Sequence, residues 1–134
     1  MPPLLPVEEA QALLEFSGLA DKRDTLAGQL AFGQQRRLEL ARAAASGASL
    51  LLLDEPAAGM NAEEIDELDV RIRTLRNQGR TILLIEHHME LVMNVCDRVV
   101  VLNFGRKIAE GTPHEVQNDA QVRTAYLGSD AVTA

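Results

Sequence analysis

The chain has 134 residues, of which 46% are hydrophobic, and a formal net charge of −7. This length predicts one domain with its own core and leaves little room for a second. The acidic balance argues against a protein that binds nucleic acid or anionic membranes nonspecifically, because such proteins neutralise phosphates with clustered lysine and arginine. No apolar run reaches the roughly 20 residues needed to cross a bilayer, so we expect a protein of the cytosol.

The first third of the chain predicts two helices. Apolar residues recur at helical spacing over Val7–Phe16, and Gly18 supplies a stop. After a polar segment, a second helical pattern starts at Gly33 and is closed by Gly47. Residues 50–53 are four consecutive leucines, a run typical of a parallel strand that is covered on both faces.

The next segment predicts a strand, a helix and a second strand. Asn61 is followed three residues later by Glu64, which is the spacing of a helix capping box, and Gly79 ends the helix. Residues 81–85 form the next apolar strand. A helix of this length between two strands is typical of a parallel β-α-β unit.

The last part of the chain predicts a helix over residues 89–95, a β-hairpin that turns at Gly105, and a helical region from Pro113 to about residue 127. The fold class is therefore α/β, with parallel strands flanked by helices and an all-helical segment at the N-terminus. Open parallel sheets bind ligands outside the carboxyl ends of their strands, so residues at those ends are the first candidates for a site.

Two adjacent carboxylates, Asp54 and Glu55, follow the four leucines. Successive side chains of an extended chain point in opposite directions, so we expect the two acids to face different species. In nucleotide hydrolases an aspartate at such a place orders Mg²⁺ through water, and an adjacent glutamate polarises the attacking water. The alternative is that both acids only end the strand at the solvent.

The segment LAFGQQRRLELARAAA places Gly33 at the start of a helix, where free N–H groups and the positive end of the dipole favour an anion. Arg36 and Arg37 support that interpretation, because cations in a first turn oppose the dipole by about 0.3–1 kcal/mol each and a nearby anion would explain them. The alternative is a solvated arginine face paired with Glu39.

His87 follows the second strand directly, as Asp54 follows the first. Its imidazole is therefore predicted to share a crevice with Asp54, where it could bond a terminal phosphate oxygen. A purely structural histidine is the alternative. A zinc site is a poor interpretation, because the chain has no H-E-x-x-H motif.

These segments, in this order and spacing, resemble the C-terminal half of an ABC transporter ATP-binding subunit. LAFGQ corresponds to the signature motif of that family, LLLLDE to its Walker B motif, AAGMN to its D-loop and IEH to its switch histidine. The wording of these segments, together with LLIEHHMELVM and VVVLNFGRKIAEGTP, is most similar to subunits that power the import of branched-chain amino acids. The resemblance covers residues 7–128.

The resemblance implies a partial P-loop NTPase-like fold with ATP and Mg²⁺ as ligands. Asp54 would hold the Mg²⁺ shell, Glu55 would be the general base for water, and His87 would contact the γ-phosphate. The signature residues would lie over the γ-phosphate of ATP bound to a partner subunit: Ala31, Phe32, Gly33 and Gln34. The D-loop residues would cross the same dimer interface: Ala58, Gly59, Met60 and Asn61.

The resemblance also implies an assembly. Its members would be a second ATP-binding subunit, in a homodimer or heterodimer, and integral membrane permease subunits, with no nucleic acid. The chain would then be cytoplasmic and peripheral on the inner face of the cell membrane. Residues 1–47 would end a helical subdomain with the signature motif, residues 48–128 would form the Walker B, D-loop and switch-histidine core, and residues 129–134 would be a tail.

The sequence departs from the common family pattern at a few positions. Ala31 stands where most members have a serine, so one side-chain hydrogen bond to phosphate is lost. Ala58 and Asn61 replace the commoner serine and aspartate of the D-loop, and we interpret both as residues typical of the branched-chain subgroup.

The chain contains no G-x-x-x-x-G-K-[ST] phosphate loop and no Gly-Lys pair. We therefore expect the isolated chain to be inactive and to bind ATP weakly, and the strands at 50–53 and 81–85 to expose apolar surface that associates. A noncatalytic module that donates its signature motif in trans to another subunit is an open alternative. A chromosome-maintenance ATPase is disfavoured by the acidic charge and the absence of coiled-coil heptads.

Overall fold

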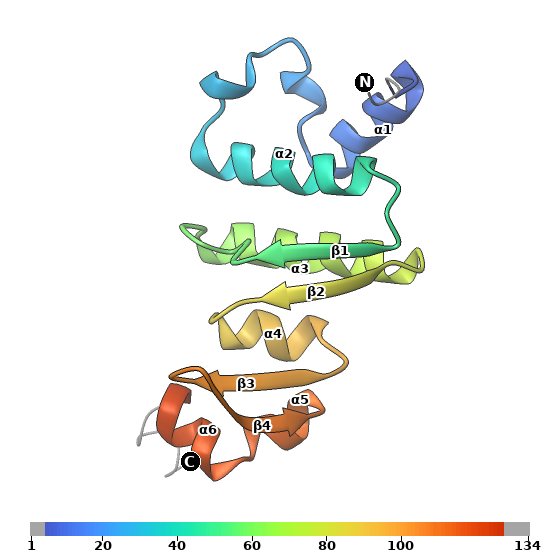
Figure 1. The fold of residues 1–134 in the computed structure, drawn as a ribbon. Coiled ribbons are helices and arrows are strands. Elements are labelled where there is room, and N and C mark those ends of the chain that lie inside the picture. The colour runs from blue at the N-terminus through green and yellow to red at the C-terminus, as the bar shows by residue number, and fades with distance from the viewer. Residues whose placement is uncertain (1–4, 128–134) are drawn as a thin grey trace. The chain divides into compact units, whose positions relative to one another are not determined.

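The computed structural model describes residues 5–127 and is shown in Figure 1. The chain separates into two compact units, one that ends at Glu86 and one that begins at His87. Among the described residues, no helix is long and apolar enough to cross a membrane. The predicted boundary at residue 48 stays a prediction, and the predicted tail at 129–134 lies outside the described residues.

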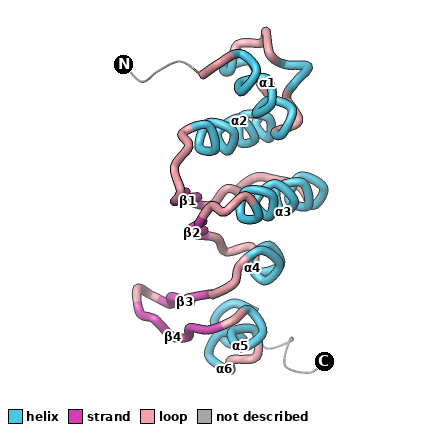
Figure 2. The backbone as a smooth tube through the Cα atoms, turned by 90° about the vertical axis from the view of Figure 1, so that its right-hand side faces the viewer, coloured by secondary structure: helices cyan, strands magenta, loops and turns pink. Residues whose placement is uncertain are grey.

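The first unit opens with helices, as predicted. Helix α1 (Val7–Phe16) is followed by two short 3-10 helices, η1 (Ala20–Lys22) and η2 (Ala27–Gln29), and by helix α2 (Phe32–Ala45). Helices α1 and α2 pack side by side (Figures 1 and 2). The two 3-10 helices lie in the polar segment for which the sequence predicts no helix or strand.

The β-α-β unit is confirmed. Strands β1 (Leu50–Asp54) and β2 (Thr81–Ile85) pair in parallel and are connected by helix α3 (Ala62–Asn77). The register sets Asp54, the last residue of β1, opposite the last residue of β2. The capping box is present as well: the Asn61 side chain accepts the Glu64 N–H at 2.9 Å, and the Glu64 carboxylate accepts the Asn61 N–H at 3.0 Å.

The expectation that the leucine strand is covered on both faces is wrong for the described chain. Helix α3 lies along one side of the two-stranded sheet (Figure 2), and the alternate leucines Leu51 and Leu53 are only 4% and 8% exposed. The opposite face carries large apolar side chains that are all more than half exposed: Leu50, Leu52, Leu83 and Ile85. The expected exposed apolar surface is therefore confirmed, because only one face of this sheet packs against a helix of the unit.

The buried residues of the first unit are shared by three elements. Leu40, Ala41 and Ala44 lie on α2, and Leu68, Ile72 and Leu75 lie on α3, in addition to the two buried leucines of β1. The buried residues of α2 lie in its C-terminal half.

The second unit is a β-hairpin with helices. Helix α4 (Met89–Val95) leads to the antiparallel strands β3 (Val99–Asn103) and β4 (Arg106–Gly111). Helices α5 (Pro113–Gln117) and α6 (Ala120–Val122) and a π-helical segment η3 (Arg123–Leu127) complete it.

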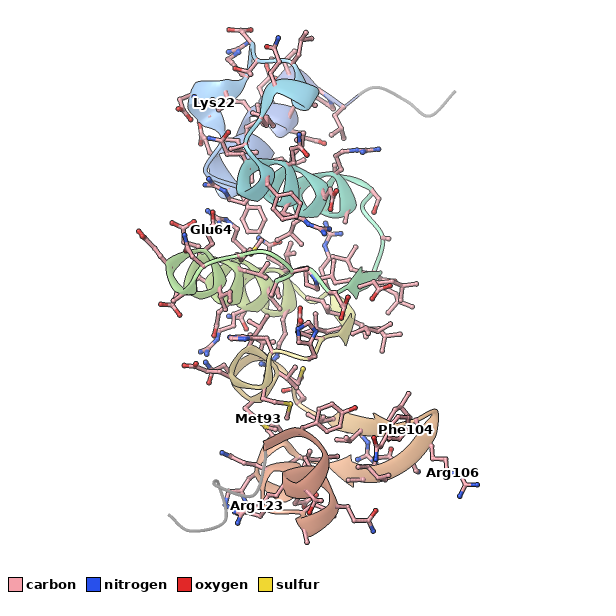
Figure 3. The ribbon with its side chains drawn as sticks, turned by 90° about the vertical axis from the view of Figure 1, so that its left-hand side faces the viewer. Lys22, Glu64, Met93, Phe104, Arg106 and Arg123 are labelled. Atoms are coloured by element: carbon pink, nitrogen blue, oxygen red, sulfur yellow. The ribbon has the colours of Figure 1, made fainter. Side chains whose placement is uncertain are left out.

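The core of the second unit and its turn follow from the sequence pattern. Its core is a cluster of valines: Val92, Val99, Val101, Val116 and Val122. The turn of the hairpin consists of Phe104 and Gly105, both with positive φ (49° and 77°), which is the backbone that a two-residue hairpin turn requires. Figure 3 shows Phe104 at this turn, where its side chain is fully exposed.

Candidate functional site

The carboxyl end of β1 presents Asp54 to the solvent. Asp54 is paired in register with Ile85, and its side chain is exposed. Within residues 5–127, its carboxylate makes no hydrogen bond or ion pair. Magnesium in nucleotide sites is commonly held by one or two carboxylates together with waters and substrate phosphates. A single exposed carboxylate with free oxygens at a strand end fits that mode of binding.

Glu55 has a backbone conformation that the sequence pattern did not predict. Its φ is +47°, in the left-handed region that residues with a Cβ rarely adopt. The premise that both residues are extended is therefore wrong, since the strand ends at Asp54, and the prediction that the two acids face different species stays a prediction. The Glu55 N–H donates to the Ile85 carbonyl at 2.7 Å, and its carbonyl accepts the Ala58 N–H at 3.1 Å. The backbone turn, and not strand alternation, sets the direction of this side chain.

The loop after Glu55 is tied to the end of β2 by a side chain. The Ala57 N–H donates to the Glu86 carboxylate at 3.1 Å, and Ala57 is only 7% exposed. Sequence reasoning missed Glu86. The available signal was its place directly after β2, one residue beyond the position that pairs with Asp54.

Helix α2 begins one residue earlier than predicted, at Phe32, with Gly33 as its second residue. Arg36 and Arg37 are therefore the fifth and sixth residues of the helix and lie beyond its first turn. The argument that they oppose the dipole of the first turn is wrong, because that effect falls off within one turn. The Ala31 N–H at the start of the helix donates to the Gln34 side chain at 3.0 Å.

The two arginines have partners in the first unit. Arg36 pairs with Glu39 at 3.2 Å, which confirms the alternative pairing, and its guanidinium lies 5.1 Å from the ring centre of Phe32. Arg37 lies 3.9 Å from the carboxylate of Glu67 on α3. These contacts fix the arginine face of α2 against α3 and against the ring at the start of the helix.

The start of α2 packs against the first turn of α3 and against the loop that precedes it, at two glycines. A Cβ on Gly33 would lie 2.4 Å from a carboxylate oxygen of Glu64, and a Cβ on Gly59 would lie 2.6 Å from the Phe32 ring. Figure 3 shows Glu64 on the side of α3 that faces α2. Residues 31–34 and 58–61, which the resemblance places at one dimer interface, are thus also in contact within the first unit. No local pattern in the sequence indicates the contact between Phe32 and Gly59.

Two family models match the chain. One, described as "ABC transporter", matches residues 6–58, and the other, described as "Branched-chain amino acid ATP-binding cassette transporter", matches residues 106–132. The chain is 49% identical over 123 residues to the high-affinity branched-chain amino acid transport ATP-binding protein LivG of Salmonella typhimurium. The chain belongs to the ATP-binding proteins of ABC transporters. The predicted family is confirmed.

Other relatives of this ABC ATP-binding chain are also ATP-binding proteins of transport or export systems. It is 46% identical to the branched-chain amino acid transport protein BraF of Pseudomonas aeruginosa, and 39% identical to the lipopolysaccharide export protein LptB of Haemophilus influenzae. These matches cover 91% and 90% of the chain but only 48% and 50% of the relatives. The LivG match likewise covers 91% of the chain and 48% of the relative. The chain therefore spans about half the length of the curated relatives it matches.

Solved structures confirm the fold class. The ADP conformation of MJ1267, an ATP-binding cassette of an ABC transporter, superposes with a TM-score of 0.81 at 32% identity. The superposition covers 96% of this ABC chain and 53% of the cassette. A nucleotide-free ATP-binding cassette from an ABC transporter gives a TM-score of 0.79, also at 32% identity.

The motifs of this ABC chain are placed as follows. The segments predicted as the signature motif (Ala31 to Gln34) and the D-loop (Ala58 to Asn61) meet in the first unit, where the Phe32 ring lies against Gly59. Asp54 ends the first strand, and Glu55 follows it with positive φ. His87 is the first residue of the second unit, so its approach to the two carboxylates stays a prediction. Within residues 5–127, no three His, Cys, Asp or Glu side chains gather into a group that could hold a metal by themselves.

Proposed function

We propose that this chain supplies the signature motif and the hydrolytic residues of an ATP-binding subunit in an ABC importer of branched-chain amino acids. The observation that carries the proposal is the arrangement at the carboxyl end of β1. There an exposed Asp54 is followed by Glu55 in a fixed left-handed turn. Ligands of parallel α/β sheets bind at this edge.

The proposed cargo class is supported by the comparisons. Two of the relatives named above are described as branched-chain amino acid transport proteins, at 49% and 46% identity over 91% of the chain. The second family model, matched at residues 106–132, is described as a branched-chain amino acid ATP-binding cassette transporter. The description of this family model supports a branched-chain amino acid transporter as the assembly.

The residues present would divide the work of hydrolysis. Asp54 would bind the hydration shell of Mg²⁺, which neutralises phosphate charge when bound. Glu55 would accept the proton of the water that attacks the γ-phosphate, and His87 would donate a hydrogen bond to a γ-phosphate oxygen.

The signature residues would act on a nucleotide held by a partner. The N–H groups of the first turn of α2, from Phe32 to Gln34, have no partner four residues back inside the helix, which favours an anion at this helix end. The missing Cβ at Gly33 makes room for the Glu64 carboxylate. Because Ala31 has no hydroxyl, the contact with the nucleotide would rest on backbone N–H groups alone. The D-loop residues, which pack against the same helix end, would line the same interface.

The proposed assembly contains a second ATP-binding subunit and integral membrane permease subunits. The chain would work on the cytoplasmic face of the membrane that carries the permease. The phosphate loop that completes the site would come from sequence outside these 134 residues, which hold no Gly-Lys pair.

A chimera tests the proposal. In the LivG relative of Salmonella typhimurium, the matched region of 123 residues is replaced by this chain, and ATP hydrolysis is measured. We expect hydrolysis by the chimera, and a loss of about 100-fold or more in kcat when Glu55→Gln removes the proton acceptor. Binding of ATP should remain within about twofold, because Gln keeps the shape of the side chain.

Two outcomes would contradict the proposal. A chimera that folds but does not hydrolyse ATP would refute the hydrolytic role of the chain. A Glu55→Gln chimera that keeps the parent kcat would refute the role of Glu55. Stimulation of a full-length relative by the isolated chain, with or without Glu55→Gln, would instead support a noncatalytic module that acts in trans.

A further inference from the structure

We propose that Glu86 is a positioning residue for Glu55: its carboxylate holds the loop after β1 so that Glu55 stays in its left-handed conformation. The inference rests on the proposed function, because it concerns the residue proposed as the proton acceptor. None of the motifs in the resemblance gives Glu86 a role, and it lies between the end of β2 and His87.

The backbone of Glu55 has a strained conformation. A residue with a Cβ at φ +47° is disfavoured by contacts of its own backbone, so it keeps this conformation only if its surroundings hold it there. A left-handed residue directly after a strand reverses the chain locally. The direction of the Glu55 carboxylate therefore depends on what holds this turn.

Two hydrogen bonds join the turn to the end of β2. The Glu55 N–H donates to the Ile85 carbonyl at 2.7 Å, and the Ala57 N–H donates to the Glu86 carboxylate at 3.1 Å. They flank Pro56, whose ring fixes its own φ. Glu55 is thus anchored on both sides, once by backbone and once by a side chain.

The hydrogen bond between Ala57 and Glu86 joins a buried backbone N–H to a partly buried carboxylate. Ala57 is 7% exposed, and a buried N–H that loses its partner is costly, so the loop would move to satisfy it. Glu86 is partly buried, and an ionised carboxylate is a stronger acceptor than a neutral oxygen. After Ala57 the chain makes a further turn, in which the Met60 N–H donates to the Ala57 carbonyl at 3.1 Å. Release of Ala57 would therefore disturb the turn that contains Glu55.

The contact is tested first on the chain itself, by hydrogen exchange of backbone amides in nuclear magnetic resonance spectra. In Glu86→Ala we expect the Ala57 amide to exchange about tenfold faster, and in Glu86→Gln we expect it to stay near the parent rate, because Gln retains an acceptor oxygen. The Thr81 amide, which donates to the Ser49 carbonyl at 2.8 Å at the other end of β2, serves as the internal control and should not change.

The positioning role is tested in the LivG chimera by separating kcat from KM. In Glu86→Ala we expect kcat to fall about tenfold or more while KM for ATP stays within about twofold, because the Glu55 carboxylate is displaced but the nucleotide contacts remain. Glu86→Gln should restore kcat to within about threefold of the parent. Glu8→Ala, which removes an exposed carboxylate on α1, is the matched control and should leave both constants unchanged.

The outcomes separate this inference from the proposed function. An active parent chimera with a Glu86→Ala kcat within twofold, or unchanged exchange of the Ala57 amide, would overturn the positioning role alone. An inactive parent chimera would overturn the proposed function, and with it the role of Glu86 in hydrolysis. If Glu86→Ala fails to fold, Glu86→Gln decides: a kcat far below the parent despite a protected Ala57 amide would refute the role of the hydrogen bond.

Discussion

The contact between Gly59 and Phe32 gives a stability prediction with a matched control. Gly59 has φ +74° and Gly47 has φ +70°, so alanine at either position pays the same left-handed cost of about 1–2 kcal/mol. The effect of alanine on the unfolded chain also cancels between the two. A Cβ at Gly47 meets nothing within 4 Å, whereas a Cβ at Gly59 lies 2.6 Å from the Phe32 ring and forces it to move.

The additional cost at Gly59 follows from what the ring would lose. The Phe32 ring lies 5.1 Å from the Arg36 guanidinium, and a cation–π contact at an exposed site contributes about 0.5–1 kcal/mol. We therefore expect Gly59→Ala to lower the free energy of unfolding by about 0.5–1 kcal/mol more than Gly47→Ala does. This corresponds to a further decrease of about 2–5 °C in Tm for a chain of this size.

The assay is urea unfolding followed by circular dichroism, with thermal melts as a second measure. Both glycine substitutions are repeated in a Phe32→Ala background, where the ring is gone and the two costs should agree to within about 0.5 kcal/mol. Equal costs in the parent chain would refute the packing of the ring on Gly59. A difference that persists without the ring would assign it to some other contact.

Two further predictions concern the surface. The ion pairs of Glu110 with Lys107 and Arg98, at 2.8 and 2.9 Å, lower the pKa of Glu110 from 4.5 to about 2, with the Lys107 hydrogen bond as the largest cause. Because this pKa is lowered on folding, the stabilisation is present above about pH 4.5 and is lost as the pH falls toward 2. A carboxyl titration followed by nuclear magnetic resonance checks it, and a midpoint near 4.5 would contradict it. On the exposed sheet face, Leu52→Gln combined with Leu83→Gln should weaken self-association of the chain about tenfold or more, because burial of a leucine contributes about 1.5–3 kcal/mol. Analytical ultracentrifugation measures the association. A parent chain that stays monomeric would refute this prediction.

The sequence by itself determined the elements and the family. The helical periodicity before Gly18, the capping box of Asn61 with Glu64, and the apolar strand at Thr81–Ile85 all appear in the structure, because each depends on interactions within a few residues. The signature, Walker B and D-loop motifs identified the family in the same way, since the order of motifs is a property of the chain alone. The placement of Asp54 at the carboxyl end of a parallel strand also followed from the pattern.

The tertiary structure decided how these pieces meet. The left-handed turn at Glu55 and its anchor on Glu86 depend on a neighbouring strand that is about 30 residues away in sequence, so no local pattern indicates them. The packing of Gly59 on Phe32 likewise joins two segments that the sequence only predicts one at a time. The leucine run fixed an apolar strand, but which of its faces is covered depends on where helices pack, and that is set by the fold and not by the hydrophobicity of the strand.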